Sequence, residues 1–180
     1  MTIQEIKTGD TFLVKGKSFL SRSICKVMKR WGKKNNYPLN FIFSHAATFV
    51  WIYDTLYLFG STESGYKPLE FDKHYSWDKD EFAVMRRSKE LSEEETNKTV
   101  RYVMHLNTIS LSYQYWNFFQ WLLLVYLNIN TFKKDSDDFT YCFESEMMRR
   151  KELNPSWYGD VYRTDIFQLF YDRHYDVIKA

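Results

Sequence analysis

Apolar and polar positions follow two different periods along this 180-residue chain, and the change of period separates predicted strands from predicted helices. Short runs rich in β-branched and aromatic residues predict strands at 11–14, about 42–52, about 55–60 and 81–87. Turns are expected at Gly9-Asp10, before the first strand, and at Tyr53-Asp54, between the second and the third. The stretch "YKPLEFDKHY" should start extended, because its first lysine precedes a proline.

Other segments have helical spacing. In "KSFLSRSICKVMKRW" the apolar residues recur every three or four positions, and Gly32 is the expected stop. The segment "LSEEETNKTVRYVMHLN" opens with the capping-box pair Ser92 and Glu95 and with acids in its first turn. The remaining predicted helices are about 113–128, one from Cys142 onward, and a short last one in "RTDIFQLFYD" capped by Thr164 or Asp165.

Strands thus prevail early and helices late, which is the pattern of an α+β fold. The length fits one domain spanning 1–180, and no repeat, low-complexity tract or Pro/Gly-rich linker divides the chain. Aromatic residues make up 19% of the chain. They are enough either to fill a core with few bulky contacts or to line a substrate groove.

Charge and hydropathy narrow the range of partners. The formal net charge is only +2, so nucleic acid is not expected as a partner. One basic stretch, "KVMKRWGKK" at 26–34, would suit phosphates, an anionic membrane surface or a solvated helix end. The most apolar stretch, 118–129, is shorter than a transmembrane span and predicts a buried helix. The start "MTIQEIKTGD" has no apolar signal core, which favours a cytoplasmic, reducing compartment.

The chain has two cysteines, Cys25 and Cys142, too few for a disulfide framework, and it has no CxxC motif of the kind that holds zinc. Cys25 lies within a predicted helix among apolar neighbours, which indicates a packing role. Cys142 begins a predicted helix, where the partial positive charge of the helix end favours a thiolate. The alternative interpretation of Cys142 is a packed, unreactive thiol.

A histidine, His45, stands at the head of the apolar run "HAATFVWIY". It is either a hydrogen-bonded core residue or a base. A thiol at a helix start and an imidazole at a strand end are the two parts of a thiolate–imidazolium pair. A third polar group normally orients the imidazole in such a pair.

Several segments resemble, in order, a known family. They are the Gly-Asp strand "IKTGDTFLVKG", the helix "SFLSRSICKVMKRW", the Ser-His strand "FSHAATFV", the extended "ESGYKPLEF", the nucleophile helix "YCFESEMMRR" and the closing "YRTDIFQLF". The chain is similar to the circularly permuted branch of the papain-like NlpC/P60 superfamily, the YiiX/YebB-like cysteine hydrolases. That resemblance implies a small antiparallel sheet or half-barrel packed against helices. It also places His45 and Cys142 in the catalytic positions, in the permuted order.

One position departs from the family pattern. The family tends to carry an acid near the end of the strand after the histidine, where this chain has Gly60. Glu63, Ser61 and Thr62 are the nearby residues that could orient the imidazole instead, and Glu63 is the preferred candidate.

The resemblance implies acyl transfer, in which the Cys142 thiolate attacks a carbonyl and His45 handles the protons, with no metal or cofactor. The expected substrate is an amide bond, in cell-wall peptide or another acylated molecule. A lipid thioesterase or acyltransferase using the same pair, and an inactive structural or interaction protein on the same fold, remain alternatives. An intracellular substrate, a non-Sec export route or delivery in a phage particle would each reconcile a bacterial cell-wall substrate with the missing signal peptide.

Overall fold

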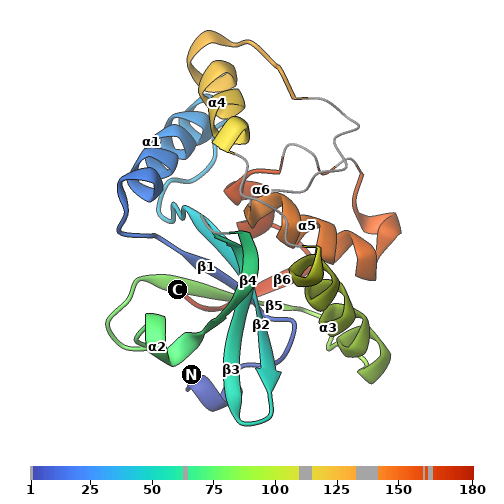
Figure 1. Cartoon of the computed structure of the whole chain (residues 1–180). Helices are drawn as coiled ribbons and strands as arrows, with labels where there is room; N and C mark the ends of the chain where they lie inside the picture. Colours follow the sequence, from blue (N-terminus) through green and yellow to red (C-terminus); the bar gives the residue numbers. More distant parts are fainter. Residues whose placement is uncertain (1, 63–64, 110–114, 133–141, 160, 162–163) are drawn as a thin grey trace.

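A computed structural model describes residues 2–62, 65–109, 115–132, 142–159, 161 and 164–180. Within these residues, six strands form one antiparallel sheet in the order β4-β3-β2-β1-β5-β6 (Figure 1). The strands are β1 (Thr11–Val14), β2 (His45–Ile52), β3 (Thr55–Thr62), β4 (Gly65–Glu70), β5 (Phe82–Arg87) and β6 (Tyr175–Lys179). The two strands at the centre, β1 and β2, therefore come from segments separated by a helix.

Helices cover the sheet and extend beyond one of its ends (Figure 1). The helices are α1 (Phe19–Lys34), α2 (Phe71–His74), α3 (Glu93–Thr108), α4 (Tyr115–Leu122), the π-helical η2 (Leu123–Leu127), α5 (Cys142–Leu153) and α6 (Ile166–Phe170), with short 3₁₀ turns η1 (Ile3–Glu5) and η3 (Pro155–Trp157). Helix α5 packs against β2 and β3, and α3 packs against α5 and β4. The expected α+β class, an antiparallel sheet packed against helices, is confirmed.

Side chains alternate between the two faces of β2, as a strand requires. Ala46 belongs to the cluster that includes Cys142 and Met147 of α5, and Thr48 bonds to α5. Ala47 and Phe49 face the other way, into an aromatic cluster with Phe12, Phe71 and Phe82. Both faces of the central strands are therefore buried.

Helix α5 carries charged side chains into the core. Glu146, Arg149 and Arg150 are each at most 2% exposed. The Thr48 hydroxyl donates to Glu146 Oε2 at 2.7 Å, and Arg149 Nε donates to the same oxygen at 3.0 Å. Arg150 Nη1 donates to Asp172 Oδ2 at 2.8 Å. Burial opposes ionisation of Glu146, but the charges of Arg149 and Arg150 hold the pKa of its carboxyl below the ordinary value. We refer to Glu146, Arg149 and Arg150 as the buried ion network.

The predicted stop at Gly32 is wrong, because α1 continues to Lys34. Gly32 is needed for packing instead. A Cβ there would lie 2.5 Å from the Phe167 ring and 2.7 Å from Leu39.

The capping box of Ser92 and Glu95 is confirmed, and Asp165 is the N-cap of α6. The expected helix at about 113–128 is present as α4 and η2 within the described residues, whereas most of the polar stretch 130–138 lies outside them.

Strand β6 follows the short last helix predicted in "RTDIFQLFYD", and the sequence pattern did not predict it. It pairs with β5 through Arg87↔Tyr175, Arg86↔Asp176 and Met85↔Val177.

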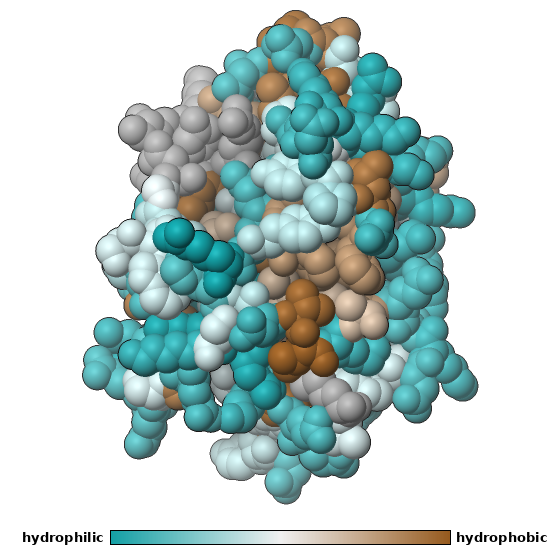
Figure 2. Space-filling model, turned by 180° about the vertical axis from the view of Figure 1, so that it is seen from behind, coloured by the Kyte–Doolittle hydropathy of each residue, from teal (hydrophilic) through white to brown (hydrophobic). Residues whose placement is uncertain are grey.

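In the part of the chain that the structure describes, no helix is long and apolar enough to cross a bilayer. Seen from behind, hydrophobic atoms are exposed near the middle and at the top of the molecule, between hydrophilic residues (Figure 2).

Candidate functional site

The Cys142 sulfur lies where the first residue of α5 meets the first residues of β2. Its Sγ is 3.9 Å from the carbonyl oxygen of Ser44, and the Ala46 backbone N–H forms a hydrogen bond to the sulfur. These two groups lie on either side of His45 in the chain. The fold therefore brings the predicted thiol to the backbone around the predicted imidazole.

The Cys142 thiol is buried, with 3% of the residue exposed. Burial raises the pKa of the thiol to about 12, although the N–H groups of Ala46, Cys142 and Phe143 stabilise the thiolate and oppose the shift. The helix start thus acts in the expected direction, but loss of hydration outweighs it. At neutral pH the thiol is protonated.

His45 is half-buried at the start of β2 and pairs with Val14 of β1. Burial lowers the pKa of its imidazole to about 4, so the ring is neutral at pH 7. Strand alternation assigns the ring to the face of Val14 and Ala47, whereas Cys142 packs with Ala46 on the other face. Among the described contacts, no hydrogen bond joins the His45 ring to the Cys142 sulfur. The two residues meet through the backbone at the end of the strand.

Position 60, where the resemblance implies an acid, leaves little room for a side chain. A Cβ on Gly60 would lie 3.0 Å from the Ala46 carbonyl oxygen and 3.0 Å from Ala47 Cβ. Strand β3 therefore passes so close to β2 that only glycine fits there without movement. Ser61 is buried, and the Thr62 hydroxyl donates to the Gly65 carbonyl at 2.8 Å. Glu63, the preferred orienting residue, lies outside the described residues.

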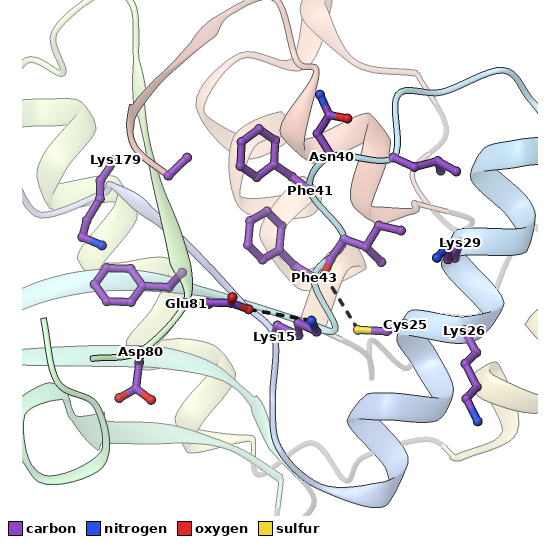
Figure 3. Close-up of a pocket in the computed structure, with 14 residues that line it drawn as sticks. Lys15, Cys25, Lys26, Lys29, Asn40, Phe41, Phe43, Asp80, Glu81 and Lys179 are labelled. Atoms are coloured by element: carbon purple, nitrogen blue, oxygen red, sulfur yellow. Dashed lines mark hydrogen bonds and ion pairs between the residues drawn. The ribbon is translucent and has the colours of Figure 1, made fainter. Parts of the chain in front are cut away.

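A cavity of about 690 Å³ lies beside this region (Figure 3). Lys26 and Lys29 of α1 line one side, Lys179 of β6 lines the other, and Phe41 and Phe43 lie between them. We call it the lysine-rimmed cavity. Phe43 is two residues before His45, so the cavity and the Cys142 region are joined by one short stretch of backbone. The basic stretch at 26–34 is a partial sequence signal for this cavity, whereas nothing in the sequence indicated the lining residues from β5 and β6.

Cys25 also lines the lysine-rimmed cavity. Its Sγ lies 3.8 Å from the Ile42 carbonyl oxygen, and the residue is half-buried. Burial raises the pKa of this thiol, while a hydrogen bond with the Ser44 side chain and the charge of Lys15 oppose the increase. Cys25 is therefore partly exposed at the cavity, and the packing role that its apolar neighbours in the sequence indicate stays a prediction.

No known family model matches the chain, and no curated protein matches it. Among solved structures, the crystal structure of metalloprotein yiiX from Escherichia coli O157:H7 matches with a TM-score of 0.56 and 19% sequence identity. The match covers 83% of this chain and 67% of that chain. The fold of this chain is YiiX-like, and at this identity the likeness is one of fold.

The description of yiiX as a metalloprotein makes a metal ion the first group to test against these residues. In the described ranges, no three His, Cys, Asp or Glu side chains come close enough together to hold a metal ion. Cys142 and His45 make two candidate ligands, whereas a catalytic zinc site uses three from the protein. The described residues therefore do not fit a metal centre at this place.

Proposed function

We propose that this chain is a cysteine-dependent hydrolase of the permuted papain-like type, cleaving an amide bond with Cys142 as nucleophile and His45 as base. The observation that carries the proposal is the position of the Cys142 sulfur at the first residue of α5, against the backbone on both sides of His45. The proposal requires the His45 ring, which strand alternation assigns to the opposite face of β2, to reach the sulfur around the first residue of the strand. The YiiX-like fold is the fold that the resemblance implied.

The proposed reaction begins with a neutral thiol and a neutral imidazole. As the Cys142 sulfur attacks the substrate carbonyl carbon, its proton passes to His45, and the carbonyl oxygen becomes an oxyanion. The N–H groups at the start of α5 stabilise charge at this place. His45 then gives the proton to the leaving amine, and a thioester remains on Cys142. A water molecule, deprotonated by His45, hydrolyses the thioester and restores the thiol.

The pKa values set a condition on this mechanism. With the Cys142 thiol at about 12 and the His45 imidazole at about 4, a resting thiolate–imidazolium pair is strongly disfavoured. Proton transfer must therefore accompany the attack on the carbonyl, as general-base catalysis rather than attack by a preformed thiolate. We infer an enzyme that reacts slowly with small electrophiles and needs a substrate bound beside the sulfur.

The test is hydrolysis of 4-nitrophenyl acetate and of alanine 4-nitroanilide by the whole chain, with mass spectrometry of the acylated protein. The proposal predicts an acyl adduct on Cys142. It also predicts that Cys142→Ala abolishes the enzymatic rate and that His45→Ala lowers it by about 10²-fold or more. Cys25→Ala is the matched control and should keep the rate. Hydrolysis that survives in Cys142→Ala, or an adduct found only elsewhere, would refute the proposal.

A second candidate function has its own support. The 3% exposure of Cys142 and the increase of its thiol pKa to about 12 are what a packed, structural cysteine would show. On this account the chain is a non-catalytic binding or interaction protein with the same fold. It predicts no acyl adduct on Cys142 and a stability loss for Cys142→Ala of about 1–2 kcal/mol, from the buried volume alone.

A further inference from the structure

We propose that the lysine-rimmed cavity binds a single-chain amphiphile with an anionic head group, of which a fatty acid is the simplest member. The cavity lies between α1, the segment before β2, and the adjacent ends of β5 and β6 (Figure 3). Its volume of about 690 Å³ is within the range of small-molecule sites. Neither Cys142 nor His45 lines it, so the proposal stands apart from the proposed hydrolase activity.

The positive charge of the cavity lining favours an anionic ligand. Lys15, Lys26, Lys29 and Lys179 line the cavity, and the first three are exposed. Helix α1, which supplies two of them, contains no acidic residue.

The acids at the cavity offset only part of this charge. Asp80 already accepts hydrogen bonds from Lys17 Nζ at 2.7 Å and from the Ser76 backbone N–H at 2.8 Å. Glu81 is exposed and lies 3.7 Å from Lys15 Nζ. Lys26 and Lys29 have no ion pair among the described residues. They are therefore free to meet the head group of a ligand.

The apolar part of the cavity lining favours a ligand with a hydrocarbon tail. Phe41, which is 39% exposed, contributes aromatic surface, and Phe43 and Phe82 lie behind the lining with 5% and 3% of each residue exposed. The Phe41 ring stacks on Phe43 at 6.4 Å between centroids and packs on Phe170 at 5.2 Å. A small hydrophilic anion would leave this surface in water, whereas an alkyl chain would cover it. The pairing of ammonium groups with an aromatic wall thus fits an amphiphile better than free phosphate or a nucleic acid.

The test is isothermal titration of the whole chain with dodecanoate below its micelle concentration. Dodecyltrimethylammonium has the same tail with a cationic head, and acetate has the same head without a tail. We expect saturable binding of one dodecanoate, with affinity at least about tenfold higher than for either comparison ligand. Bound dodecanoate should also slow the maleimide labelling of Cys25, which lines the cavity, and leave Cys142 unaffected.

Matched variants on the same helix locate the site. Lys26→Gln/Lys29→Gln should weaken dodecanoate binding about tenfold, whereas Lys33→Gln/Lys34→Gln removes equal charge from the last turn of α1 and should change it less than about twofold. Equal losses in both variants, equal binding of the cationic detergent, or no saturable binding would overturn the proposal. So would co-sedimentation with phosphatidylglycerol vesicles without binding of free dodecanoate, because that result assigns the lysines to a membrane surface.

Discussion

The reactivity of two side chains in this protein, His45 and Cys142, depends on their burial as much as on their chemical type. His45 and Cys142 have the chemistry of a catalytic pair, and the fold brings them to the same end of β2. Burial then moves the two pKa values apart, upward for the thiol and downward for the imidazole. If they act together, His45 is available as a base across the whole neutral range.

This gives a prediction for the pH dependence of the proposed hydrolysis. His45 must be unprotonated to accept the thiol proton, and burial lowers its pKa to about 4. The rate should therefore stay nearly constant from about pH 8 to about pH 5 and fall as the pH drops through about 4. Stopped assays with 4-nitrophenyl acetate measure this profile. A fall centred near the ordinary histidine value of about 6.5 would show that the ring is hydrated in solution.

Glu144 gives a prediction for stability at the same scale. It is 3% exposed on α5, and burial raises the pKa of its carboxyl to about 8. Between about pH 4.5 and 8 the folded state keeps a proton that the unfolded state loses. The free energy of unfolding should therefore decrease with increasing pH in this window, by up to about 1.4 kcal/mol per pH unit.

Denaturant unfolding of Glu144→Gln and of the unchanged chain at several pH values measures this effect. The variant cannot ionise, so its stability should vary less with pH, and its advantage should increase from pH 5 to pH 8. Parallel curves for the two proteins would contradict a buried, protonated Glu144.

At the level of elements, α5 is held in place by the buried ion network together with the buried apolar residues Cys142, Phe143 and Met147. The sequence showed acids early and bases late in this helix, which is equally typical of a solvated helix aligned with its dipole. What makes α5 a buried helix rather than a solvated one is its contact with Thr11 and Thr48. Their hydroxyls donate to Glu146 from the two central strands. Partners so distant in sequence leave no local pattern.

The prediction at this scale concerns Glu146. Glu146→Gln removes the carboxylate from two buried guanidinium groups, so it should destabilise the protein by about 3–5 kcal/mol. Glu152→Gln is the matched control, an exposed position on the same helix, with an expected change within about 0.5 kcal/mol. Urea unfolding measures both. Equal, small effects would mean that the network contributes little to holding α5 on the sheet.

The capping box at Ser92, the Asp165 cap and strands β1 to β5 could be predicted because their signals are local. The extension of α1 past Gly32 could not, because it depends on contacts of that glycine with Phe167 and Leu39. Strand β6 was missed for a similar reason, since among the described strands it pairs only with β5, and its core contacts come from distant segments such as α5. At the candidate site, residue identity was visible in sequence, but the burial that sets the pKa values was not.

At the level of the whole molecule, the central strands β1 and β2 contribute side chains to apolar clusters on both faces of the sheet. A chain built this way should unfold as one unit, and its unfolding tests the prediction of a single domain over 1–180. Tryptophan fluorescence and far-UV circular dichroism should give thermal transitions with the same midpoint. Two separated transitions would show that the chain contains more than one cooperative unit.

The same architecture puts two features at one end of the sheet, the Cys142–His45 region and the lysine-rimmed cavity, linked through Phe43 and Ser44.

The central claim is that His45 assists reaction at the Cys142 sulfur. The most direct measurement is the second-order rate of iodoacetamide alkylation of Cys142 at pH 7, in a Cys25→Ala background with and without His45→Ala. The account predicts that loss of the imidazole slows alkylation at least about tenfold. Equal rates in the two proteins would contradict it and leave Cys142 as a packing residue.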